Sequence, residues 1–353
     1  MSDTDTLIID TTARIFQELA DPQAVIAAVD DSWKTALWNA LEEAGLTLAW
    51  VHEDHGGAGA AISDGFDILY VAGRHAVAVP LAETLLGGWL MARGGLQVPP
   101  GPMTVAVGSR AEPLRIRGRH LHGCARGVPF PALAEHVACV ADGEGGPQVV
   151  LVATESADIM PTAGMAGDGI GQMLFNGAPA IAAARAPNTL GLEDVMLMGA
   201  AVRAQQMAGA LQAVLDLSVS YAQEREAFGR PIAKFQAVQQ NLARLAGETA
   251  AASAVAASAA DTIHHAETFD DAVFLEVAAA KIRCGEAAAE GAAIAHQAHG
   301  AMGYTDEHAL HRFTLRLFQW RDDFGSESEW AAGLGAMVAA NGADRLWPMV
   351  ASR

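Results

Sequence analysis

The sequence predicts a mostly α-helical protein with a small β domain in the middle of the chain. Apolar residues recur at helical spacing before about residue 100 and again beyond Leu190, and short β-branched runs lie between these two regions. The composition agrees, because 51% of the residues are hydrophobic, only 6% are aromatic, and alanine and glycine are abundant. This profile is typical of closely packed helices. A chain of 353 residues is long enough for several domains, and we expect boundaries at residues 1–102, 103–187 and 188–353.

The amino-terminal region alternates helical patterns with loops marked by glycine. In the segment 33–44, Leu37 and Leu41 fall on one helical face, and Gly45 is expected to end the helix. Two further helices are expected, at residues 63–75 with Ser63 or Asp64 as the N-cap and at residues 84–93.

The middle region changes to short apolar runs that are separated by glycine, proline and aspartate. The three clearest runs are residues 104–107, 137–140 and 149–152. Short strands at such spacing predict a small antiparallel barrel or a sandwich, and Pro187 is expected to mark the end of this domain.

Beyond Leu190 the chain is expected to be helical again, in four long segments. The alanine-rich stretch 250–260 is interpreted as a face of small residues that lets two helices approach closely. The four segments are residues 193–225, 235–265, 270–300 and 307–322.

Two polar islands interrupt this helical region, at residues 221–239 and 297–307. In the first, Arg225 is expected at a helix end, followed by Phe228 and by Pro231, which would start the next helix. A guanidinium at such a corner can form paired hydrogen bonds to a diphosphate, and the aromatic ring can lie against a flat ligand ring. The alternative is an ordinary turn with Phe228 in the core and Arg225 paired to Glu224 or Glu226.

The two islands, in this order and separation, resemble the carboxy-terminal domain of the acyl-CoA dehydrogenases. The resemblance covers nearly the whole chain, since that family also has a helical domain, a β domain and then a four-helix bundle. It implies FAD as the cofactor, held at a corner that reaches across a subunit interface to the neighbouring protomer's FAD. The implied contacts are Arg225 with the diphosphate, Phe228 and Gln236 with the cofactor, and Gln297, Gly300 and Ala301 with its adenosine half.

The catalytic base of that family is a glutamate, and it is missing from the expected places. In most members it follows the fourth bundle helix, where this chain has Phe324, and in a minority it lies in the first, where this chain has Gly199. The best substitute nearby is Asp323, with Asp322 and Glu327 behind it. The alternative is a solvated helix end in which Arg321 offsets the aspartates.

The resemblance therefore implies FAD-dependent α,β-desaturation of an acyl-CoA thioester, most simply by a hetero-oligomer in which this chain is the subunit without the usual glutamate. Two alternatives stay open. One is a homo-oligomeric dehydrogenase with Asp323 as base, and the other is a non-catalytic scaffold of the same fold. The implied partners are the acyl-CoA substrate and an electron-transferring flavoprotein. The implied assembly is a dimer or a tetramer that includes a second dehydrogenase-like chain.

Charge and composition exclude other classes of function. A net charge of −19 argues against nucleic acid and against an anionic membrane surface as partners. The three cysteines are isolated, the first ten residues lack the pattern of an export signal, and no apolar run reaches membrane-spanning length, so we expect a cytoplasmic protein. Three histidine pairs have spacings of three residues, but no further ligand completes a metal site: His52 and His55, His296 and His299, and His308 and His311.

Overall fold

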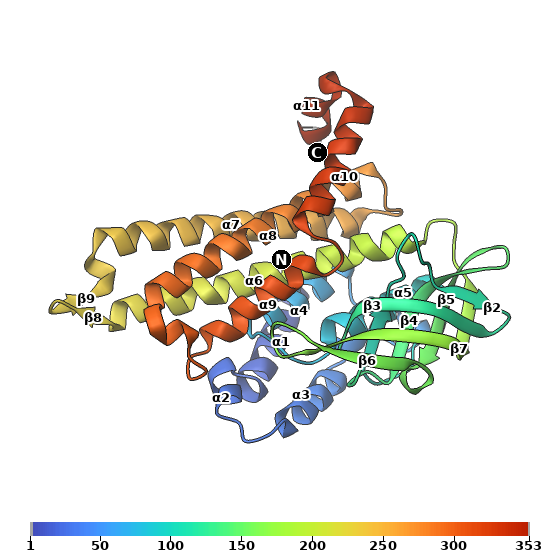
Figure 1. The fold of residues 1–353 in the computed structure, drawn as a ribbon, viewed down its shortest axis with the longest axis horizontal. Coiled ribbons are helices and arrows are strands. Elements are labelled where there is room, and N and C mark those ends of the chain that lie inside the picture. The colour runs from blue at the N-terminus through green and yellow to red at the C-terminus, as the bar shows by residue number, and fades with distance from the viewer. Residues whose placement is uncertain (1–2, 352–353) are drawn as a thin grey trace.

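A computed structural model describes residues 3–351 of the chain. Met1 and Ser2, which begin the acidic amino-terminal stretch, and the last two residues lie outside the described range. Helices at the amino terminus, coloured blue, pack beside a green β region, and long helices coloured yellow to red extend from both as an arm (Figure 1).

Five helices make up the amino-terminal part. The third helix buries Leu37 and Leu41, as their spacing predicts, and Gly45 follows in the left-handed conformation with φ of 70°. The predicted N-cap of the fourth helix is wrong, because Ala61 is the N-cap and Asp64 accepts a hydrogen bond from its backbone N–H at 2.9 Å. The helices are α1 (Asp3–Leu19), α2 (Pro22–Ile26), α3 (Ser32–Glu43), α4 (Ile62–Arg74) and α5 (Leu81–Arg93), with short 3₁₀ turns at Leu46–Leu48 and Glu53–His55.

Seven strands form a small closed barrel. Hydrogen-bonded neighbours run in the ring β4–β2–β3–β7–β5 and back to β4, while β1 pairs with β4 and β6 with β7. The barrel encloses its own hydrophobic core, with Leu121, Val150 and Phe175 among its buried side chains. The strands are β1 (Met103–Ala106), β2 (Arg115–Arg117), β3 (His120–Pro129), β4 (His136–Gly143), β5 (Gly146–Ala153), β6 (Asp158–Ala163) and β7 (Gly169–Arg185), with a 3₁₀ turn at Thr154–Ser156.

The sequence identified only part of this barrel. The three expected runs correspond to β1, β4 and β5, whereas β2, β3, β6 and β7 were not predicted. The expectation of a purely antiparallel sheet is also wrong, because β1 and β2 both run parallel to β4. A pairing of this kind depends on residues that are distant in the chain, so local patterns do not indicate it.

The long carboxy-terminal helices pack side by side. α6 contacts α7, α8 and α9, and α8 contacts α7 and α9. Alanine supplies much of the interface, including the buried Ala252, Ala256 and Ala259 of the stretch that we interpreted as a close-packing face. The helices are α6 (Leu192–Glu224), α7 (Gln236–His265), α8 (Asp271–His299) and α9 (Leu310–Asp322).

Two more helices follow α9 that the sequence did not predict. α10 (Glu327–Asn341) packs on α8, and α11 (Ala343–Ala351) continues away from the body (Figure 1). Between residues 3 and 351, no helix has both the length and the apolar character that crossing a membrane requires.

Candidate active site

The first polar island forms an exposed corner at the end of the helical arm. α6 ends at Glu224, and Arg225 is its C-cap, with its backbone N–H bonded to the carbonyl of Tyr221 at 2.8 Å. A two-stranded hairpin follows, with β8 (Glu226–Ala227) paired to β9 (Arg230–Pro231). At its turn Phe228 and Gly229 both adopt positive φ, 53° and 76°. Figure 1 shows this hairpin at the far end of the arm, opposite the barrel.

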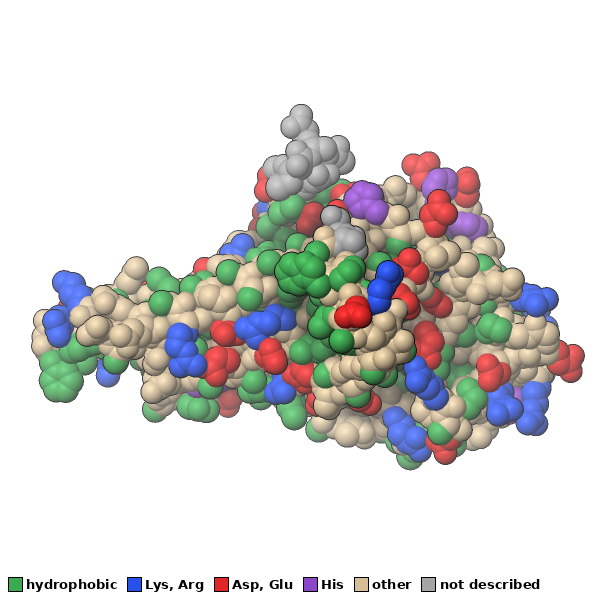
Figure 2. Space-filling model, turned by 90° about the horizontal axis from the view of Figure 1, so that it is seen from above, with side chains coloured by type: hydrophobic (Ala, Val, Ile, Leu, Met, Phe, Trp, Pro, Cys, Tyr) green, Lys and Arg blue, Asp and Glu red, His purple; other side chains and the backbone are tan. Residues whose placement is uncertain are grey.

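The side chains of this corner face outward. Phe228 is 97% exposed and meets Phe235 edge-on, with 6.2 Å between ring centroids. Among residues 3–351, no hydrogen bond or ion pair engages the guanidinium of Arg225. The alternative of an ordinary core turn with a paired Arg225 is therefore wrong. Viewed from above, the arm narrows to a tip at which hydrophobic side chains show on the surface (Figure 2).

Pro231 does not start the next helix, as the sequence suggested. It lies in β9, a 3₁₀ turn at Ile232–Lys234 follows, and α7 begins only at Gln236, whose side chain is exposed. The hairpin thus projects the corner further from the helices than a direct helix–turn–helix connection would.

The second island lies at the same end of the arm. α8 ends at His299, whose ring stacks on Tyr221 of α6 with centroids 4.4 Å apart, and Gln297 accepts a hydrogen bond from the amide of Asn241 on α7 at 3.3 Å. The fold therefore brings the two islands together. Gly300 has φ of 60° and ψ of −140°, a conformation almost restricted to glycine, and it opens a 3₁₀ turn at Gly300–Tyr304. Gly300 and Ala301 are exposed.

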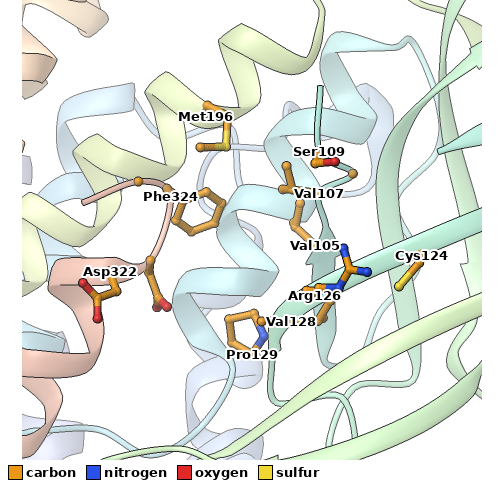
Figure 3. Close-up of a pocket in the computed structure, with 14 residues that line it drawn as sticks. Val105, Val107, Ser109, Cys124, Arg126, Val128, Pro129, Met196, Asp322 and Phe324 are labelled. Atoms are coloured by element: carbon orange, nitrogen blue, oxygen red, sulfur yellow. The ribbon is translucent and has the colours of Figure 1, made fainter. Parts of the chain in front are cut away.

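A separate pocket of about 420 Å³, here called the barrel pocket, lies between the barrel and the amino-terminal end of α6. Valines of β1 and β3 form one wall, and Met196 of α6 with the connection between α9 and α10 forms the other (Figure 3). The lining residues are Val105, Val107, Gly108, Ser109, Cys124, Arg126, Gly127, Val128, Pro129, Met196, Asp322, Asp323, Phe324 and Gly325.

The two positions that the resemblance assigns to a glutamate meet at this pocket. Phe324 has φ of 55°. Its ring lies close to Gly199, and a Cβ added to Gly199 would be only 2.3 Å from Cδ1 of the ring. The carbonyl of Phe324 accepts a hydrogen bond from the indole of Trp330 at 3.0 Å. A bulky residue at positive φ is strained, so the neighbours must hold it. Gly199 and Phe324 therefore fit each other as a pair, and neither can exchange a proton.

Asp323 is the C-cap of α9 and lines the pocket, but its side chain is not solvated as the alternative expected. Its Oδ2 accepts a hydrogen bond from Nε of Arg203 at 2.9 Å, and its side chain is 13% exposed. Burial raises the pKa of Asp323, while the charges of Arg203 and Lys281 oppose that rise. Arg321, expected to offset the aspartates, instead donates from Nε to Glu327 at 2.6 Å.

Arg203 is the centre of a buried polar network behind the pocket. Besides Asp323, its guanidinium donates to Glu83 of α5 and to Gln206, each at 2.6 Å. Arg203 and Glu83 are 2% and 3% exposed. Burial raises the pKa of Glu83, and its pairing with Arg203 works against that rise. The network ties α5, α6 and the segment after α9 together.

Lys281 of α8 also holds the segment after α9 in place, through hydrogen bonds to its backbone. Its ammonium donates to the carbonyls of Arg321 and Gly325, each at 2.6 Å, and thereby brackets Asp323 and Phe324. Burial lowers the pKa of Lys281 to about 8.

The sequence did not indicate Arg203, Glu83 or Lys281 as site residues. Arg203 is 120 positions from each of its two acidic partners, and Lys281 is 40 and 44 positions from the carbonyls that it bonds. Each residue lies among mostly apolar neighbours in its helix, and a charged residue in such a pattern was the only available clue. No cluster of three or more histidine, cysteine, aspartate or glutamate residues within the described chain has the arrangement of a metal site.

Known proteins resemble the chain at three levels. The family model for the acyl-CoA dehydrogenase carboxy-terminal domain matches residues 193–318. The acyl-CoA dehydrogenase IpdE2 of Mycobacterium tuberculosis is 28% identical to this chain, and the match covers 88% of this chain and 89% of IpdE2. The acyl-CoA dehydrogenase FadE27 of the same organism is 26% identical, and the match covers 90% of this chain and 91% of FadE27. Among solved structures, the ChsE4–ChsE5 complex of the same organism has a TM-score of 0.84 at 24% identity and covers 96% of this chain and 98% of its own. These comparisons support a divergent member of the acyl-CoA dehydrogenase family, because residues 193–318 match that family's carboxy-terminal domain and the full-length relatives align over most of the chain.

Proposed function

We propose that this protein is one subunit of an FAD-dependent acyl-CoA dehydrogenase that desaturates an acyl-CoA thioester between its α and β carbons. The observation that carries the proposal is the position of the exposed corner relative to the barrel pocket. Met196 of α6 borders the pocket, and Arg225, the C-cap of the same helix, forms the corner. At a rise of about 1.5 Å per residue, the two residues are about 44 Å apart.

No single dinucleotide bridges that distance. The corner of one chain therefore serves a pocket on another chain, and the flavin would lie between two subunits. The chemistry that FAD supplies when bound is acceptance of the hydride from the β carbon. The proposal includes a four-helix bundle of α6–α9 and the three domains at residues 1–102, 103–187 and 188–353.

The residues at the corner fit the phosphate and adenosine parts of such a cofactor. Arg225 has a guanidinium without a partner in the described part of the chain, and a diphosphate accepts paired hydrogen bonds from that group. Phe228 offers an exposed ring, and no heavy atom lies within 4 Å of where a side chain at Gly300 would begin. We assign FAD contacts to Arg225, Phe228, Gln236, Gln297, Gly300 and Ala301.

The pairing of Phe324 with Gly199 supports a non-identical partner. Removal of the α proton needs a base beside the thioester in a pocket that excludes water. Two apolar residues fill the places where the family's glutamate is expected, and we propose that the partner subunit contributes both the glutamate and the flavin-ring environment for the shared cofactor. The ChsE4–ChsE5 structure is a complex of two proteins, which supports this arrangement. The proposed partner that would accept the electrons is an electron-transferring flavoprotein.

A homo-oligomeric enzyme with Asp323 as base is the second candidate, favoured by the place of Asp323 in the pocket wall. Its engagement with Arg203 is the argument against it, because a carboxylate held by a guanidinium is a weaker base.

Flavin content tests these alternatives. The chain is purified alone and after co-expression with a dehydrogenase-like chain from the same genome, and flavin absorbance and acyl-CoA-dependent dye reduction are measured. The half-enzyme predicts little flavin alone, and bound flavin with activity after co-expression. One FAD per chain and full activity alone, abolished by Asp323→Asn, would establish the homo-oligomer. A chain that stays colourless in both preparations would be a scaffold, and the proposal would be wrong.

A further inference from the structure

A second cavity, of about 600 Å³, lies between the amino-terminal helices, the β6–β7 connection and α9. We name it the arginine cavity. It shares no lining residue with the barrel pocket. Its lining residues are Val25, Ala28, Val29, Asp30, Asp31, Trp33, Lys34, Ala78, Ala166, Gly167, Asp168, Arg312 and Arg316.

Two of the three cations in this cavity already have acidic partners. Lys34 donates to Asp31 at 2.8 Å, and Arg316 donates to Asp168 at 2.6 Å. Arg316 is almost fully buried, and its Nη1 also donates to the carbonyl of Arg312 at 3.1 Å. The carboxylate of Asp30 accepts the backbone N–H of Ser32 at 2.9 Å.

Arg312 is the cation without such a partner. Between residues 3 and 351, its guanidinium forms no hydrogen bond or ion pair, and its Nε is buried without an acceptor. The Nε of Arg316 beside it is likewise buried without an acceptor. Burial and the charge of Arg316 lower the pKa of Arg312 to about 10, so the group stays charged at neutral pH.

A half-buried guanidinium without a hydrogen-bond acceptor destabilises the protein, because the charge loses water and the more distant Asp168 and Asp31 offset only part of that loss. An anion in the adjacent cavity would remove that cost. Trp33, Val25 and Ala78 give the same cavity an apolar wall, which suits a molecule with an apolar body and one anionic end.

We infer that the arginine cavity binds an organic monocarboxylate, whose carboxylate pairs with Arg312 and whose apolar body lies against Trp33. A carboxylate matches the planar fork of a guanidinium. Asp30, Asp31 and Asp168 line the same space, so a doubly charged phosphate would meet stronger repulsion than a singly charged carboxylate. This site is independent of the proposed flavin chemistry.

Calorimetric titration with benzoate tests the site, with benzamide as the neutral ligand of the same shape. Wild-type protein should bind benzoate saturably and benzamide at least about tenfold more weakly, which corresponds to about 1.4 kcal/mol. Arg312→Gln should weaken benzoate binding by a similar factor. Arg244→Gln, which removes an exposed arginine on α7 remote from the cavity, should leave it unchanged.

Two further measurements guard against a variant that only unfolds. The circular dichroism of Arg312→Gln should match that of the wild type, and its melting temperature should be no lower. Ala166→Leu, which narrows the cavity and keeps every charge, should also weaken benzoate binding. Equal benzoate affinity in wild type and Arg312→Gln would overturn the inference. So would binding of inorganic phosphate in preference to benzoate, or equal binding of benzoate and benzamide.

Discussion

Arg203 shows how a single buried charge sets the geometry of the barrel pocket. It is 2% exposed and donates to two carboxylates, Glu83 and Asp323, on elements that approach α6 from different sides. A guanidinium keeps its charge throughout the physiological pH range, so it fixes both acids at once. The position of Asp323, and through it that of Phe324, depends on this residue.

Replacement of Arg203 by methionine should be strongly destabilising. The side chain has a similar length, but Glu83 loses its counter-charge and Asp323 keeps only that of Lys281, and breaking a buried pair in this way costs about 3–5 kcal/mol. Urea unfolding followed by circular dichroism measures the loss. Arg244→Met provides the control, because its ion pair with Glu290 is exposed and such pairs contribute at most about 1 kcal/mol. Equal losses in the two variants would contradict this account of the network.

His75 should make stability depend on pH. Its ring packs against Phe16, with centroids 5.6 Å apart, and burial lowers its pKa to about 4 from an ordinary value of 6.5. The folded state therefore favours the neutral ring. The stability that this contributes is complete above about pH 6.5 and is lost as the pH falls through about 4.

Urea unfolding at pH 7 and at pH 4.5 tests this contribution. His75→Phe should lose less stability between the two pH values than the wild type, because an uncharged ring stays in place. His265→Phe, at an exposed position, is the matched control and should keep the wild-type difference. If the two variants behave alike, His75 does not supply the pH dependence.

At the scale of helices and strands, predictability followed the length and regularity of the apolar pattern. The helices α6–α9 were identified within about three residues, and for α6, α7 and α8 a regular spacing over 33, 30 and 29 residues outweighs any local irregularity. β7 was missed although it spans 17 residues, since much of Gly169–Arg185 is alanine, glycine and asparagine, which disfavour strands locally. Its pairing with β3, β5 and β6 stabilises it instead.

The contact between α4 and α6 depends on two glycines. A Cβ at Gly209 of α6 would lie 2.0 Å from the carbonyl oxygen of Tyr70, and one at Gly73 of α4 would lie 2.2 Å from that of Gln206. Both obstructing atoms belong to the backbone of the opposite helix, which cannot rotate away. The two helix axes therefore approach more closely than any side chain would permit.

Gly209→Ala should consequently destabilise the protein, by about 1–3 kcal/mol or more, as expected for overpacking that must move backbone. Gly247→Ala is the matched control on α7, because no heavy atom lies within 4 Å of the place that its Cβ would take. Alanine in an open helical position should stabilise by about 0.5–1 kcal/mol. Thermal unfolding of both variants measures the difference, and a neutral Gly209→Ala would refute the close approach.

At the scale of the whole molecule, the sequence indicated the exposed corner of the candidate site but not the barrel pocket. The corner could be predicted because Arg225, Phe228 and Gln236 lie within one short segment, and Gln297 follows in the next island. The barrel pocket could not, since its walls come from residues 105–129, from Met196 and from residues 322–325. Only the packing of α6 and α9 against the barrel brings these segments together.

The exposed corner leads to a prediction about assembly. The side chains of Arg225 and Phe228 contribute little to the stability of the isolated chain, because Arg225 has no ion pair in the described part of the molecule and Phe228 is 97% exposed, with only an edge-on contact to Phe235. Their replacement should therefore leave the melting temperature of the isolated chain unchanged. The effect should appear only when the corner meets a second subunit.

Arg225→Ala tests this in the co-expressed complex. If Arg225 pairs with the diphosphate as proposed, its loss should weaken FAD retention by at least about tenfold, since charge-assisted bonds contribute about 1.5–3 kcal/mol. Flavin absorbance after dialysis measures retention, and Arg14→Ala, an exposed arginine on α1, is the control for lost charge. Unchanged flavin content would refute the diphosphate role. A lowered melting temperature of the isolated Arg225→Ala chain would instead mean that the corner stabilises its own fold, and the argument for a site shared between two subunits would lose its basis.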